Sequence, residues 1–263
     1  MNARLILIIP VYNCEPQLPR VLHRLDAHLL ALIGEVVVID NLSTDRTVDV
    51  GIEAAKTLQT KVTILRNVSN FNLGGTLKIG FLYAMEHGYD FVLVLHGDDQ
   101  ATLTDFTGVL KKGEYLQEDL VIGARFHSQS KLSGYSWFRI FGNRVLNFIC
   151  GLITKRKIDD LIAGLNCYRV DFLRDKVFLN FPDDLTFDVH LLLLGFVRGA
   201  GIRFVPISWR EEDQISNAKV FRQTWIILKL FARFVVCRRQ LFPSASDLAG
   251  KQAKYRSEMV YSK

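Results

Sequence analysis

The chain has 263 residues, of which 49% are hydrophobic and 23% charged, and this composition excludes an intrinsically disordered protein. Its formal net charge is +6, but no aromatic and basic recognition motif accompanies that charge, so we expect no nucleic-acid partner. The four cysteines lie far apart without paired spacing, which excludes a zinc-finger pattern and a disulfide framework.

The first half of the chain alternates between strand-like and helix-like segments. Apolar runs predict strands at 5–9, 35–39, 61–65 and 91–95, and helical periodicity predicts helices near 16–33, 45–58 and 74–88. This alternation predicts an α/β fold with a mostly parallel central sheet flanked by helices. No signal-peptide pattern precedes the first strand, so we expect a cytoplasmic protein.

The second half contains fewer predicted strands and more predicted helix. We expect a helix at 104–117, a strand at 120–123, a mobile Ser- and Gly-containing loop at 127–136, helices near 137–153 and 184–197, a strand at 202–207 and a helix at about 218–237. The chain then divides into one α/β domain over 1–217, a basic amphipathic helix within 218–240 and a polar, frayed tail at 241–263.

The apolar run Phe91–Leu95 ends abruptly in the polar segment HGDDQ at 96–100. Ligands of open α/β sheets bind at the carboxyl ends of such buried strands. If the segment stays extended, alternate residues point the same way, and His96, Asp98 and Gln100 offer one nitrogen and two oxygens to a divalent cation. The alternative is a solvated turn before the next helix.

Two further strand ends carry side chains suited to a nucleotide. Tyr12 follows the first strand in LILIIPVYN, and Asp40 ends the second in EVVVIDNLSTD. An aromatic ring can cover a base, and a carboxylate can accept hydrogen bonds from a base or a ribose hydroxyl. The alternative for Asp40 is turn formation, with Ser43 or Asp45 capping the following helix.

Over residues 5 to about 220 the chain resembles the family 2 glycosyltransferases with the GT-A fold. It is similar especially to the branch that uses polyprenyl phosphate acceptors, which includes the dolichyl-phosphate mannose synthases. The resemblance is carried by PVYN at 10–13, VVVIDNLSTDRT at 36–47, NFNLGGTLKIGF at 70–81, LHGDDQ at 95–100, VIGARF at 121–126 and a helix with Trp137, Arg139 and Asn147.

The resemblance implies a Rossmann-like sheet that binds a UDP- or GDP-linked sugar together with Mg²⁺ or Mn²⁺. Asp98 would be the retained metal-binding carboxylate and Gln100 a further ligand. The family usually has Asp where this chain has His96, and a histidine nitrogen suits Mn²⁺ at least as well as Mg²⁺. The residues that correspond to the donor site are Pro10, Val11, Tyr12, Asn13, Asp40, Asn70, Gly75, Lys78, Gly97 and Asp98. For Gly75, close packing of helix on strand is the alternative.

The resemblance also implies an acceptor side. Arg125 and Arg139 match positions that hold an acceptor phosphate, with Asn143 beside them, and guanidinium groups recognise phosphate oxygens in bidentate fashion. Asp188 would lie near the acceptor, although acidic residues are also common at helix amino termini. Together with Asp98, we expect Arg125, Arg139 and Asp188 to be catalytic. The residues that correspond to a diphosphate-binding loop are Arg210, Ser216 and Asn217.

These implications lead to three hypotheses about function. The first is an inverting transferase that moves a sugar to a polyprenyl phosphate. In the second, the acceptor is a saccharide hydroxyl in cell-surface polysaccharide assembly, which must lose a proton to a base such as Asp184 or Asp188. In the third, His96 and Asn41 weaken catalysis and the chain is a nucleotide-binding or scaffold protein. A dehydrogenase is disfavoured because no G-x-G-x-x-G follows the first strand.

The segment at 225–237 is the part of the sequence that bears on membrane contact. It is shorter than the roughly 20 apolar residues needed to cross a bilayer, and it contains Lys229 and Arg233. Its basic and aromatic side chains fit a helix that lies in an anionic membrane interface, and the alternative is a helix packed on the domain with its basic face in water. We expect a peripheral protein at the inner face of the cell membrane, alone or with a separate membrane subunit.

Overall fold

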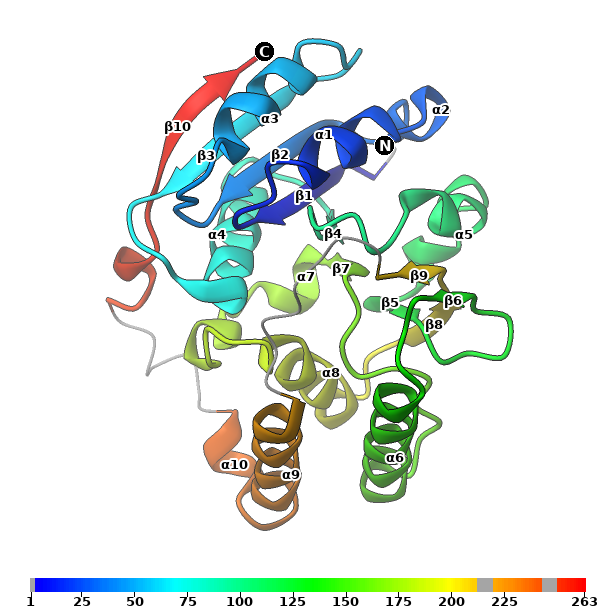
Figure 1. The fold of residues 1–263 in the computed structure, drawn as a ribbon. Helices are drawn as coiled ribbons and strands as arrows, with labels where there is room; N and C mark the ends of the chain where they lie inside the picture. The colour runs from blue at the N-terminus through cyan, green and yellow to red at the C-terminus, as the bar shows by residue number, and fades with distance from the viewer. Residues whose placement is uncertain (1–2, 212–219, 243–249) are drawn as a thin grey trace.

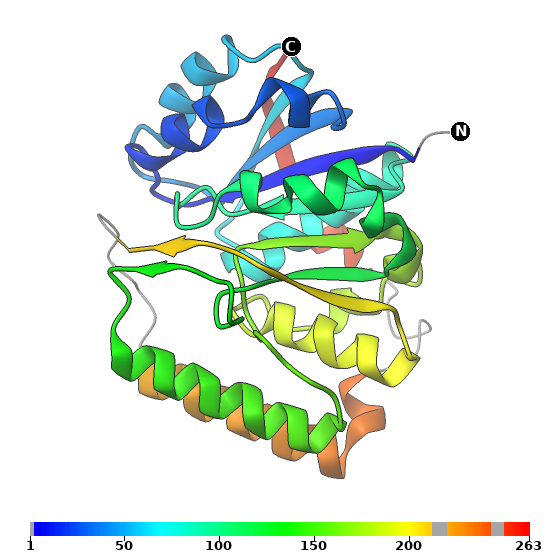
Figure 2. The same ribbon diagram turned by 90° about the vertical axis from the view of Figure 1, so that its right-hand side faces the viewer.

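The computed structural model describes residues 3–211, 220–242 and 250–263, and within these residues eight strands form one sheet (Figures 1 and 2). In spatial order they are β10 (Ser257–Ser262), β3 (Val62–Asn67), β2 (Glu35–Asp40), β1 (Leu5–Val11), β4 (Phe91–Leu95), β7 (Leu165–Arg169), β5 (Leu120–Ala124) and β8 (Ile202–Pro206). β7 and β10 run antiparallel to their neighbours, whereas the other neighbouring pairs are parallel. The predicted mostly parallel α/β sheet is confirmed.

Helices cover both faces of the sheet. They are α1 (Gln17–His23), α2 (Ala27–Leu30), α3 (Thr47–Ala55), α4 (Asn72–Glu86), α5 (Thr107–Lys111), α6 (Trp137–Thr154), α7 (Val170–Leu173), α8 (Phe187–Arg198), α9 (Val220–Val236) and α10 (Arg238–Leu241). In β1, Leu5, Leu7 and Ile9 pack with α1, α2, α3 and α5. The alternate residues Ile6 and Ile8 belong to the other cluster, with α4, α7 and α8. Both faces of β1 are therefore core.

Short elements interrupt two of the predicted helices. Asp26 accepts a hydrogen bond from His28 N at 2.6 Å and begins α2, so the helix predicted at 16–33 is divided in two. The helix predicted at 104–117 consists of α5 between two short 3₁₀ helices. In the part of the chain that the structure describes, the 3₁₀ helices are Leu103–Phe106, Glu114–Gln117, Val177–Asn180 and Gln252–Lys254.

A two-stranded parallel ribbon fixes the end of the loop predicted at 127–136. It pairs β6 (Leu132–Ser133) with β9 (Trp209–Arg210). Gly134 has a φ of 71°, and a Cβ on it would lie 2.3 Å from Glu211 O. The ribbon therefore holds the start of α6 against the segment around residue 211.

The tail predicted to be frayed is a strand of the sheet. β10 pairs with β3, and Val62 and Lys263 exchange backbone hydrogen bonds of 3.3 and 2.9 Å. Since the backbone groups at the edge of β3 need partners, a polar tail can complete the sheet without being apolar. We expected the domain to end at residue 217, but the strand β10 near the carboxyl terminus belongs to the same sheet as the rest of the domain.

Most of the apolar face of α9 packs into the core, while Trp225, Val235 and Val236 are exposed. Ile227, Leu230, Phe231 and Phe234 are buried in the same cluster as α4 and α8. α9 lies beside α6 at the end of the molecule farthest from α1 and α3 (Figures 1 and 2). No helix in the described ranges combines the length and the apolar character that crossing a bilayer requires.

Candidate active site

The carboxyl ends of β2, β1 and β4 lie together because these strands are adjacent and parallel. Asp40 ends β2, Tyr12 and Asn13 follow β1, and the 96–100 segment follows β4. The ring of Tyr12 is 43% exposed and is accessible to a ligand. The predicted convergence of these groups at one edge of the sheet is confirmed.

Gly97 brings the ends of β1 and β4 into direct contact. Its N–H donates to Pro10 O at 3.1 Å, and a Cβ on it would lie 2.2 Å from Val11 Cγ1. A side chain at residue 97 would therefore push the two strand ends apart. Pro10, Val11 and Gly97 shape the site through backbone contacts.

The 96–100 segment is a turn and not the extended continuation of β4. Asp99 has a φ of 60°, and Gln100 N–H donates to Asp98 Oδ1 at 3.2 Å. Alternate residues therefore do not point the same way, and the geometry expected for His96, Asp98 and Gln100 as a ligand set is wrong. No group of three His, Cys, Asp or Glu side chains within the described residues is placed to hold a metal ion.

His96 packs into the protein interior. The backbone N–H of His96 donates to Gly164 O at 2.8 Å. A Cβ on Gly164 would lie 3.0 Å from Nδ1 of the His96 ring. The ring Nε2 is buried and has no hydrogen-bond partner among the described residues. Burial lowers the pKa of His96, although Asp188 opposes this shift. The prediction of His96 as a metal ligand is therefore corrected to a neutral, packed side chain.

Asp98 has the properties of a cation ligand. Burial raises the pKa of Asp98 to about 6, the N–H of Gln100 opposes this shift, and the charges of Asp99 and Glu211 add to it. Among the described residues, no Lys or Arg forms an ion pair with Asp98. A Mg²⁺ or Mn²⁺ ion would relieve this unbalanced negative charge, and carboxylate and amide oxygens are ligands that both ions accept. Asp98 and Gln100 therefore fit such an ion.

Asp99 anchors the turn through arginines, which the sequence does not predict. Its side chain is 6% exposed and pairs with Arg20 Nε at 2.9 Å, Arg24 Nη1 at 2.5 Å and Arg210 Nη2 at 2.8 Å. The left-handed backbone of Asp99 turns this carboxylate away from the direction of Asp98. Arg210 therefore stands beside the turn, as a diphosphate contact requires, whereas Ser216 and Asn217 lie outside the described residues.

Asp40 is engaged within its own loop. Its carboxylate is fully buried, accepts the N–H of Ser43 at 3.1 and 3.2 Å and lies 3.4 Å from Arg66 Nε. Asn13 joins this loop to β1, because its N–H donates to Ser43 Oγ at 2.9 Å and its Oδ1 accepts from Thr44 N at 2.9 Å. The turn alternative is therefore correct for Asp40, whose carboxylate is buried, whereas Asn13 is exposed and its contact with a nucleotide stays a prediction.

Three asparagines form an amide network behind this loop. Asn41 Nδ2 donates to Asn70 Oδ1 at 2.9 Å, and Asn41 Oδ1 accepts from Asn67 Nδ2 at 3.1 Å and Phe71 N at 2.8 Å. Asn41 is a structural residue, and its presence is no sign of weakened catalysis. Asn70 is exposed at the rim and is still available to a ligand.

Gly75 and Gly74 allow close packing of α4. A Cβ on Gly75 would lie 2.5 Å from Phe71 Cβ, and one on Gly74 would lie 2.8 Å from Phe187 Cβ. Gly74 N also donates to Asp183 O at 2.7 Å. The packing alternative accounts for both glycines without a nucleotide contact.

Lys78 is an internal cation with no exposed side-chain surface. Its side chain is 0% exposed, and its Nζ donates to Phe181 O at 2.5 Å, Asp183 Oδ1 at 2.6 Å and Tyr255 Oη at 2.9 Å. Burial lowers the pKa of Lys78, and Asp183 opposes this shift. Lys78 thus joins α4 to Asp183 and to Tyr255, which lies just before β10, and this burial argues against its predicted role in nucleotide binding.

Arg125 is largely committed to a buried ion pair. Its Nε lies 2.8 Å from Asp160 Oδ2 and its Nη2 lies 2.9 Å from Asp160 Oδ1. The guanidinium also lies 5.0 Å from the ring centroid of Phe126 and 5.0 Å from that of Trp209. Only Nη1 extends toward the acceptor side, 3.5 Å from Tyr135 Oη. Arg125 positions this region and can offer one N–H group, not a bidentate grip.

Arg139 is the accessible cation of the predicted acceptor side. Its guanidinium lies 4.6 Å from the ring centroid of Tyr135, and its Nη1 donates to both carboxylate oxygens of Glu211 at 2.6 and 2.7 Å. Asn143 Nδ2 donates to Arg139 O at 2.7 Å and lies 3.4 Å from Tyr135 Oη. Tyr135 therefore gathers Arg125, Arg139 and Asn143, and sequence reasoning missed both Tyr135 and Glu211.

Asp188 is sealed in the core. It is 5% exposed, its Oδ1 accepts from Tyr168 Oη at 3.0 Å, and its Oδ2 has no hydrogen-bond partner among the described residues. Burial raises the pKa of Asp188, and His96 opposes this shift. This burial argues against the predicted catalytic role of Asp188, because the carboxylate has little surface to offer an acceptor. The side chain of Asp184 accepts hydrogen bonds from Thr186 N and Oγ1 at 2.8 and 2.6 Å.

Residues 6–176 match the protein family described as Glycosyl transferase family 2. The chain belongs to this family. It is therefore a glycosyltransferase that depends on nucleotide sugars, and the family resemblance found in the sequence is confirmed. The polyprenol monophosphomannose synthase of Mycolicibacterium smegmatis is 24% identical over 81% of this chain and 79% of the relative. The undecaprenyl-phosphate mannosyltransferase of Micrococcus luteus is 28% identical over 80% of this chain and 85% of the relative.

Solved structures support the GT-A fold of this family 2 enzyme. Glucosyl-3-phosphoglycerate synthase from Mycobacterium tuberculosis, in complex with uridine diphosphate, superposes with a TM-score of 0.64 at 16% identity and covers 89% of this chain and 80% of its own. The same enzyme with Mn²⁺ and uridine-diphosphate-glucose gives a TM-score of 0.60 at 16% identity, covering 92% and 80%. At this identity the likeness concerns the fold alone.

Proposed function

We propose that the enzyme moves a sugar from a UDP- or GDP-linked donor to a polyprenyl phosphate at a membrane surface, with inversion at the sugar carbon. The observation that carries the proposal is the position of Glu211, which pairs with Arg139 at 2.6 Å and directly follows Arg210, whose backbone N–H donates to Gln100 O at 3.0 Å. A diphosphate at Asp98 and an acceptor phosphate at Arg139 would therefore be neighbours. The names of the two mannosyl-transferring relatives support this acceptor class.

The donor would bind over the ends of β1 and β4. Tyr12 would cover the base, Arg210 would contact the diphosphate, and Asp98 with Gln100 would hold a Mg²⁺ or Mn²⁺ ion. When bound, the ion supplies charge neutralisation for the departing diphosphate. The structural neighbour described with Mn²⁺ and uridine-diphosphate-glucose supports an ion of this class.

The acceptor phosphate would replace Glu211 on Arg139, with Asn143 and one N–H of Arg125 beside it. A phosphate oxygen attacks the sugar carbon, and the bond from that carbon to the donor diphosphate breaks with its electron pair leaving on the diphosphate. One displacement inverts the carbon. A phosphate is already ionised at neutral pH, so no general base is required. The sealed position of Asp188 is compatible with this acceptor and unfavourable for a saccharide hydroxyl.

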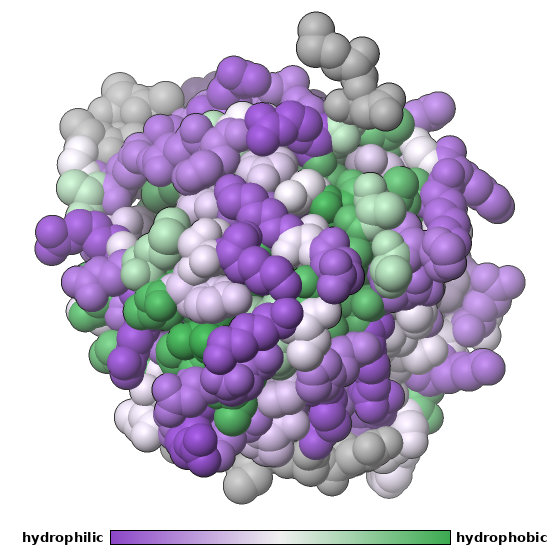
Figure 3. All heavy atoms as spheres, turned by 90° about the horizontal axis from the view of Figure 1, so that it is seen from above, coloured by the Kyte–Doolittle hydropathy of each residue, from purple (hydrophilic) through white to green (hydrophobic). Residues whose placement is uncertain are grey.

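The surface of α6 favours a membrane-embedded acceptor. Five apolar side chains, spaced three or four residues apart, form an exposed stripe along it. They are Trp137 (76% exposed), Phe141 (62%), Val145 (39%), Phe148 (65%) and Leu152 (65%). The opposite end of the molecule, above α1 and α3, is mostly hydrophilic (Figure 3). In this proposal α6 lies on the cytoplasmic leaflet, and the basic outer side of α9 lies next to it. The enzyme attaches there alone or together with a separate membrane subunit.

The test is a screen of UDP- and GDP-sugars, with Mg²⁺ or Mn²⁺, against a polyprenyl phosphate and against saccharide acceptors. Transfer to the lipid phosphate is expected, and failure with every lipid phosphate would remove the proposal. Transfer to saccharides only would establish the second hypothesis instead.

Asp98→Asn removes the charge that the proposal assigns to the ion. We expect transfer to fall by at least about 100-fold, because the ion would supply several kcal/mol of charge stabilisation. Initial rates at saturating Mn²⁺ and the Kd of Mn²⁺ measure the effect. Asp49→Asn is the matched control, since Asp49 has a side chain that is 69% exposed on α3. Unchanged rates in Asp98→Asn would contradict the assignment of this carboxylate.

A further inference from the structure

His96 and Asp188 each keep one buried polar atom without a hydrogen bond. The atoms are Nε2 of His96 and Oδ2 of Asp188, and neither has a partner among the described residues. A buried polar atom that stays unpaired costs free energy, so two of them in one region require an explanation. The two atoms are complementary, because a neutral imidazole can donate from Nε2 and a carboxylate oxygen accepts.

The sheet places both side chains on the same face. β4 and β7 pair in the register Val94↔Asn166, and the hydrogen bond from His96 N to Gly164 O continues this pairing beyond the end of β4. Since side chains alternate along a strand, His96 shares the face of Val94. That face packs against α8, which carries Asp188 in its first turn. The two unpaired atoms therefore belong to one interface between sheet and helix.

Tyr168 fixes Asp188 in this interface and leaves one of its oxygens free. The Tyr168 side chain lies on the same face of β7, and its Oη donates to Asp188 Oδ1 at 3.0 Å. Because the hydroxyl is the donor, Asp188 is an acceptor, and its Oδ2 can accept a second hydrogen bond. The charges of Asp188 and His96 also shift each other's pKa, upward for His96 and downward for Asp188. These shifts agree with the shared face.

Gly164 supports the His96 ring from the side of β7. A Cβ on Gly164 would lie 3.0 Å from the ring Nδ1 and 3.1 Å from Cγ, so the ring lies directly against this glycine. His96 as a whole is half-buried, whereas its Nε2 is fully covered. The Nε2 end of the ring therefore points into the interior.

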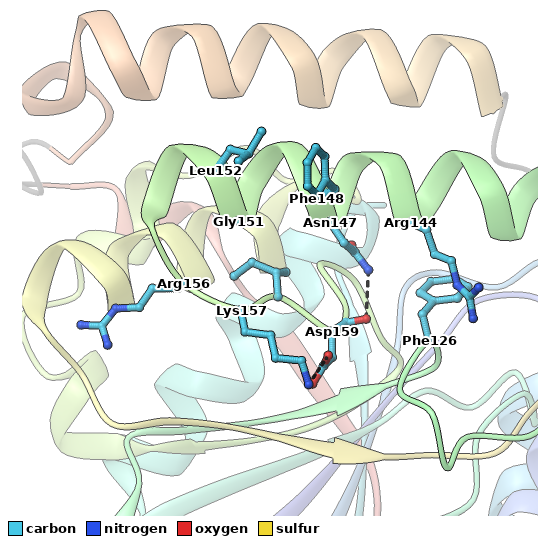
Figure 4. A pocket seen from close by; sticks show the side chains of 10 residues that line it. Phe126, Arg144, Asn147, Phe148, Gly151, Leu152, Arg156, Lys157 and Asp159 are labelled. Carbon is cyan, nitrogen blue, oxygen red and sulfur yellow. Dashed lines mark hydrogen bonds and ion pairs between the residues drawn. The ribbon is translucent and has the colours of Figure 1, made fainter.

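The segment that leads to Gly164 is fastened to the acceptor side. Asn147 Nδ2 on α6 donates to Asp159 O at 2.9 Å (Figure 4). The backbone N–H of Arg125 donates to Asp160 Oδ2 at 2.9 Å, beside the ion pair of the same two side chains. The support beneath the ring is thus fixed by two neighbouring elements, and a partner for Nε2 would fix the ring itself.

We infer that Asp188 is a positioning residue for the donor site. Its Oδ2 accepts a hydrogen bond from His96 Nε2–H, through a small side-chain rotation or one bridging water, and the ring then fixes the point at which the turn with Asp98 leaves β4. Asp188 touches neither donor nor acceptor. The inference rests on the proposed function, which assigns the ion to Asp98, two residues after His96. Supporting groups of this kind keep a binding side chain in its productive position.

Nitrogen-15 NMR of the His96 ring in the full, metal-free chain tests the hydrogen bond. The unmodified chain should carry the ring proton on Nε2, and a proton on Nδ1 would overturn the inference without any variant. Asp188→Asn keeps an oxygen acceptor and should keep this tautomer. Asp188→Leu has a similar volume but no acceptor, so the ring should become a mixture of both tautomers, and the backbone amide signals of Gly97 and Gln100 should move with it.

The Kd of Mn²⁺ alone tests the effect on the turn. Asp188→Leu should weaken Mn²⁺ binding about tenfold, whereas Asp188→Asn should bind like the unmodified chain. Equal weakening in both variants would overturn the inference, because the charge of Asp188 and not its hydrogen bond would then matter. Glu35→Gln is the matched control, since it alters another buried carboxylate at the start of β2 and should change neither the Kd nor the His96 ring. Circular dichroism checks that each variant is folded.

A double-mutant cycle tests whether Asp188 acts through His96. In a His96→Phe background, Asp188→Leu should cause no further loss of Mn²⁺ affinity, and additive losses would contradict the link. If the unmodified enzyme binds no Mn²⁺ and transfers nothing to lipid phosphates, the proposed function fails. The ring tautomer and the amide signals of the turn still decide the inference in that case, because neither depends on the ion.

Discussion

Asp98 and Asp99 are neighbours in the chain with opposite environments. Asp99 is neutralised by Arg20, Arg24 and Arg210, and its left-handed backbone makes that arrangement possible. Asp98 is left with a raised pKa because burial and the surrounding carboxylates disfavour its charge. The turn thus separates a structural carboxylate from one that is available to a cation. The two environments lie one residue apart, and the sequence alone does not reveal them.

Sequence identified the location of the site better than the roles of its residues. Asp98, Arg139 and Tyr12 lie where the sequence places them, because each position depends mainly on a strand end or a helix start. Lys78 and Asp188 do not, since whether a polar side chain is buried depends on elements distant in the sequence. Tyr255, for example, reaches Lys78 from the far end of the chain. Burial of this kind leaves no periodic signal.

Gly97→Ala tests the close approach of β1 and β4. The added Cβ would lie 2.2 Å from Val11 Cγ1, so we expect a loss of about 1–3 kcal/mol in the free energy of unfolding. Gly108→Ala is the matched control, because no heavy atom lies within 4 Å of its Cβ, and alanine should stabilise α5 by up to about 1 kcal/mol. Urea unfolding measures both. Equal stability of the two variants would contradict the contact.

At the scale of elements, the contribution of α4 is to link the sheet to the C-terminal segment. Its glycines admit the 182–187 loop, and Lys78 joins Asp183 and Tyr255. Sequence periodicity predicted α4 and the parallel strands because a buried strand or an amphipathic helix repeats along the chain. It missed β7 and β10, since a strand inserted between distant strands, or added at an edge, is selected by the pairing it completes.

Lys78→Met tests whether this link is structural. The variant leaves Asp183 without its internal cation, and we expect a loss of about 3 kcal/mol in the free energy of unfolding, because breaking one side of a buried pair is costly. Donor affinity of the folded fraction should be unchanged, which titration calorimetry measures. Lys56→Met, with a lysine side chain that is 55% exposed, is the control. Weaker donor binding at unchanged stability would return Lys78 to the nucleotide site.

Glu35 ties the start of β2 to its surroundings. Its buried carboxylate accepts hydrogen bonds from Thr63 Oγ1 at 2.6 Å, Tyr83 Oη at 2.9 Å, Tyr89 Oη at 2.8 Å and Lys61 Nζ at 3.1 Å. Burial acts to raise the pKa of Glu35, but the four hydrogen bonds outweigh burial and lower it below the ordinary value of 4.5. The charged form is therefore favoured by folding.

The pH dependence of stability follows from this lowered pKa. Since the folded value lies below the unfolded one, the contribution of Glu35 is complete above about pH 4.5 and is lost as the pH falls through the folded value. Glu35→Gln should therefore flatten the decline of the unfolding free energy in acid, as measured by urea unfolding at a series of pH values. Glu53→Gln, at a side chain that is 72% exposed, should keep the original slope. A slope unchanged in Glu35→Gln would contradict the assignment.

At the scale of the whole molecule, polar and apolar surfaces lie at opposite ends. The α1 and α3 end is mostly hydrophilic, whereas α6 presents its apolar stripe at the other end, beside α9 (Figures 2 and 3). Sequence analysis assigned the membrane-facing role to α9, because its amphipathic pattern is strong. The structure uses most of the apolar side of α9 for the core, and the longer exposed stripe belongs to α6. Amphipathicity predicts that a helix has an apolar face, but not what covers that face.

Trp137→Ser/Phe141→Ser tests whether the α6 stripe contacts a bilayer. Both side chains are more than half exposed, at 76% and 62%, so their loss should affect folding little. Burial of a large apolar side chain in the interface contributes on the order of 1–2 kcal/mol, so the double variant should bind neutral vesicles at least about tenfold more weakly. Flotation and vesicle titration measure the change.

The matched control for the stripe is Leu116→Ser/Val68→Ser, at two apolar side chains that are each 42% exposed away from α6. It should bind vesicles like the unmodified chain. If the control loses as much binding as the α6 variant, the attachment is nonspecific. If neither loses binding, the membrane contact lies elsewhere. Loss in the α6 variant alone would place the entrance to Arg139 at the bilayer surface, because Trp137 and Arg139 lie on the same first turns of α6.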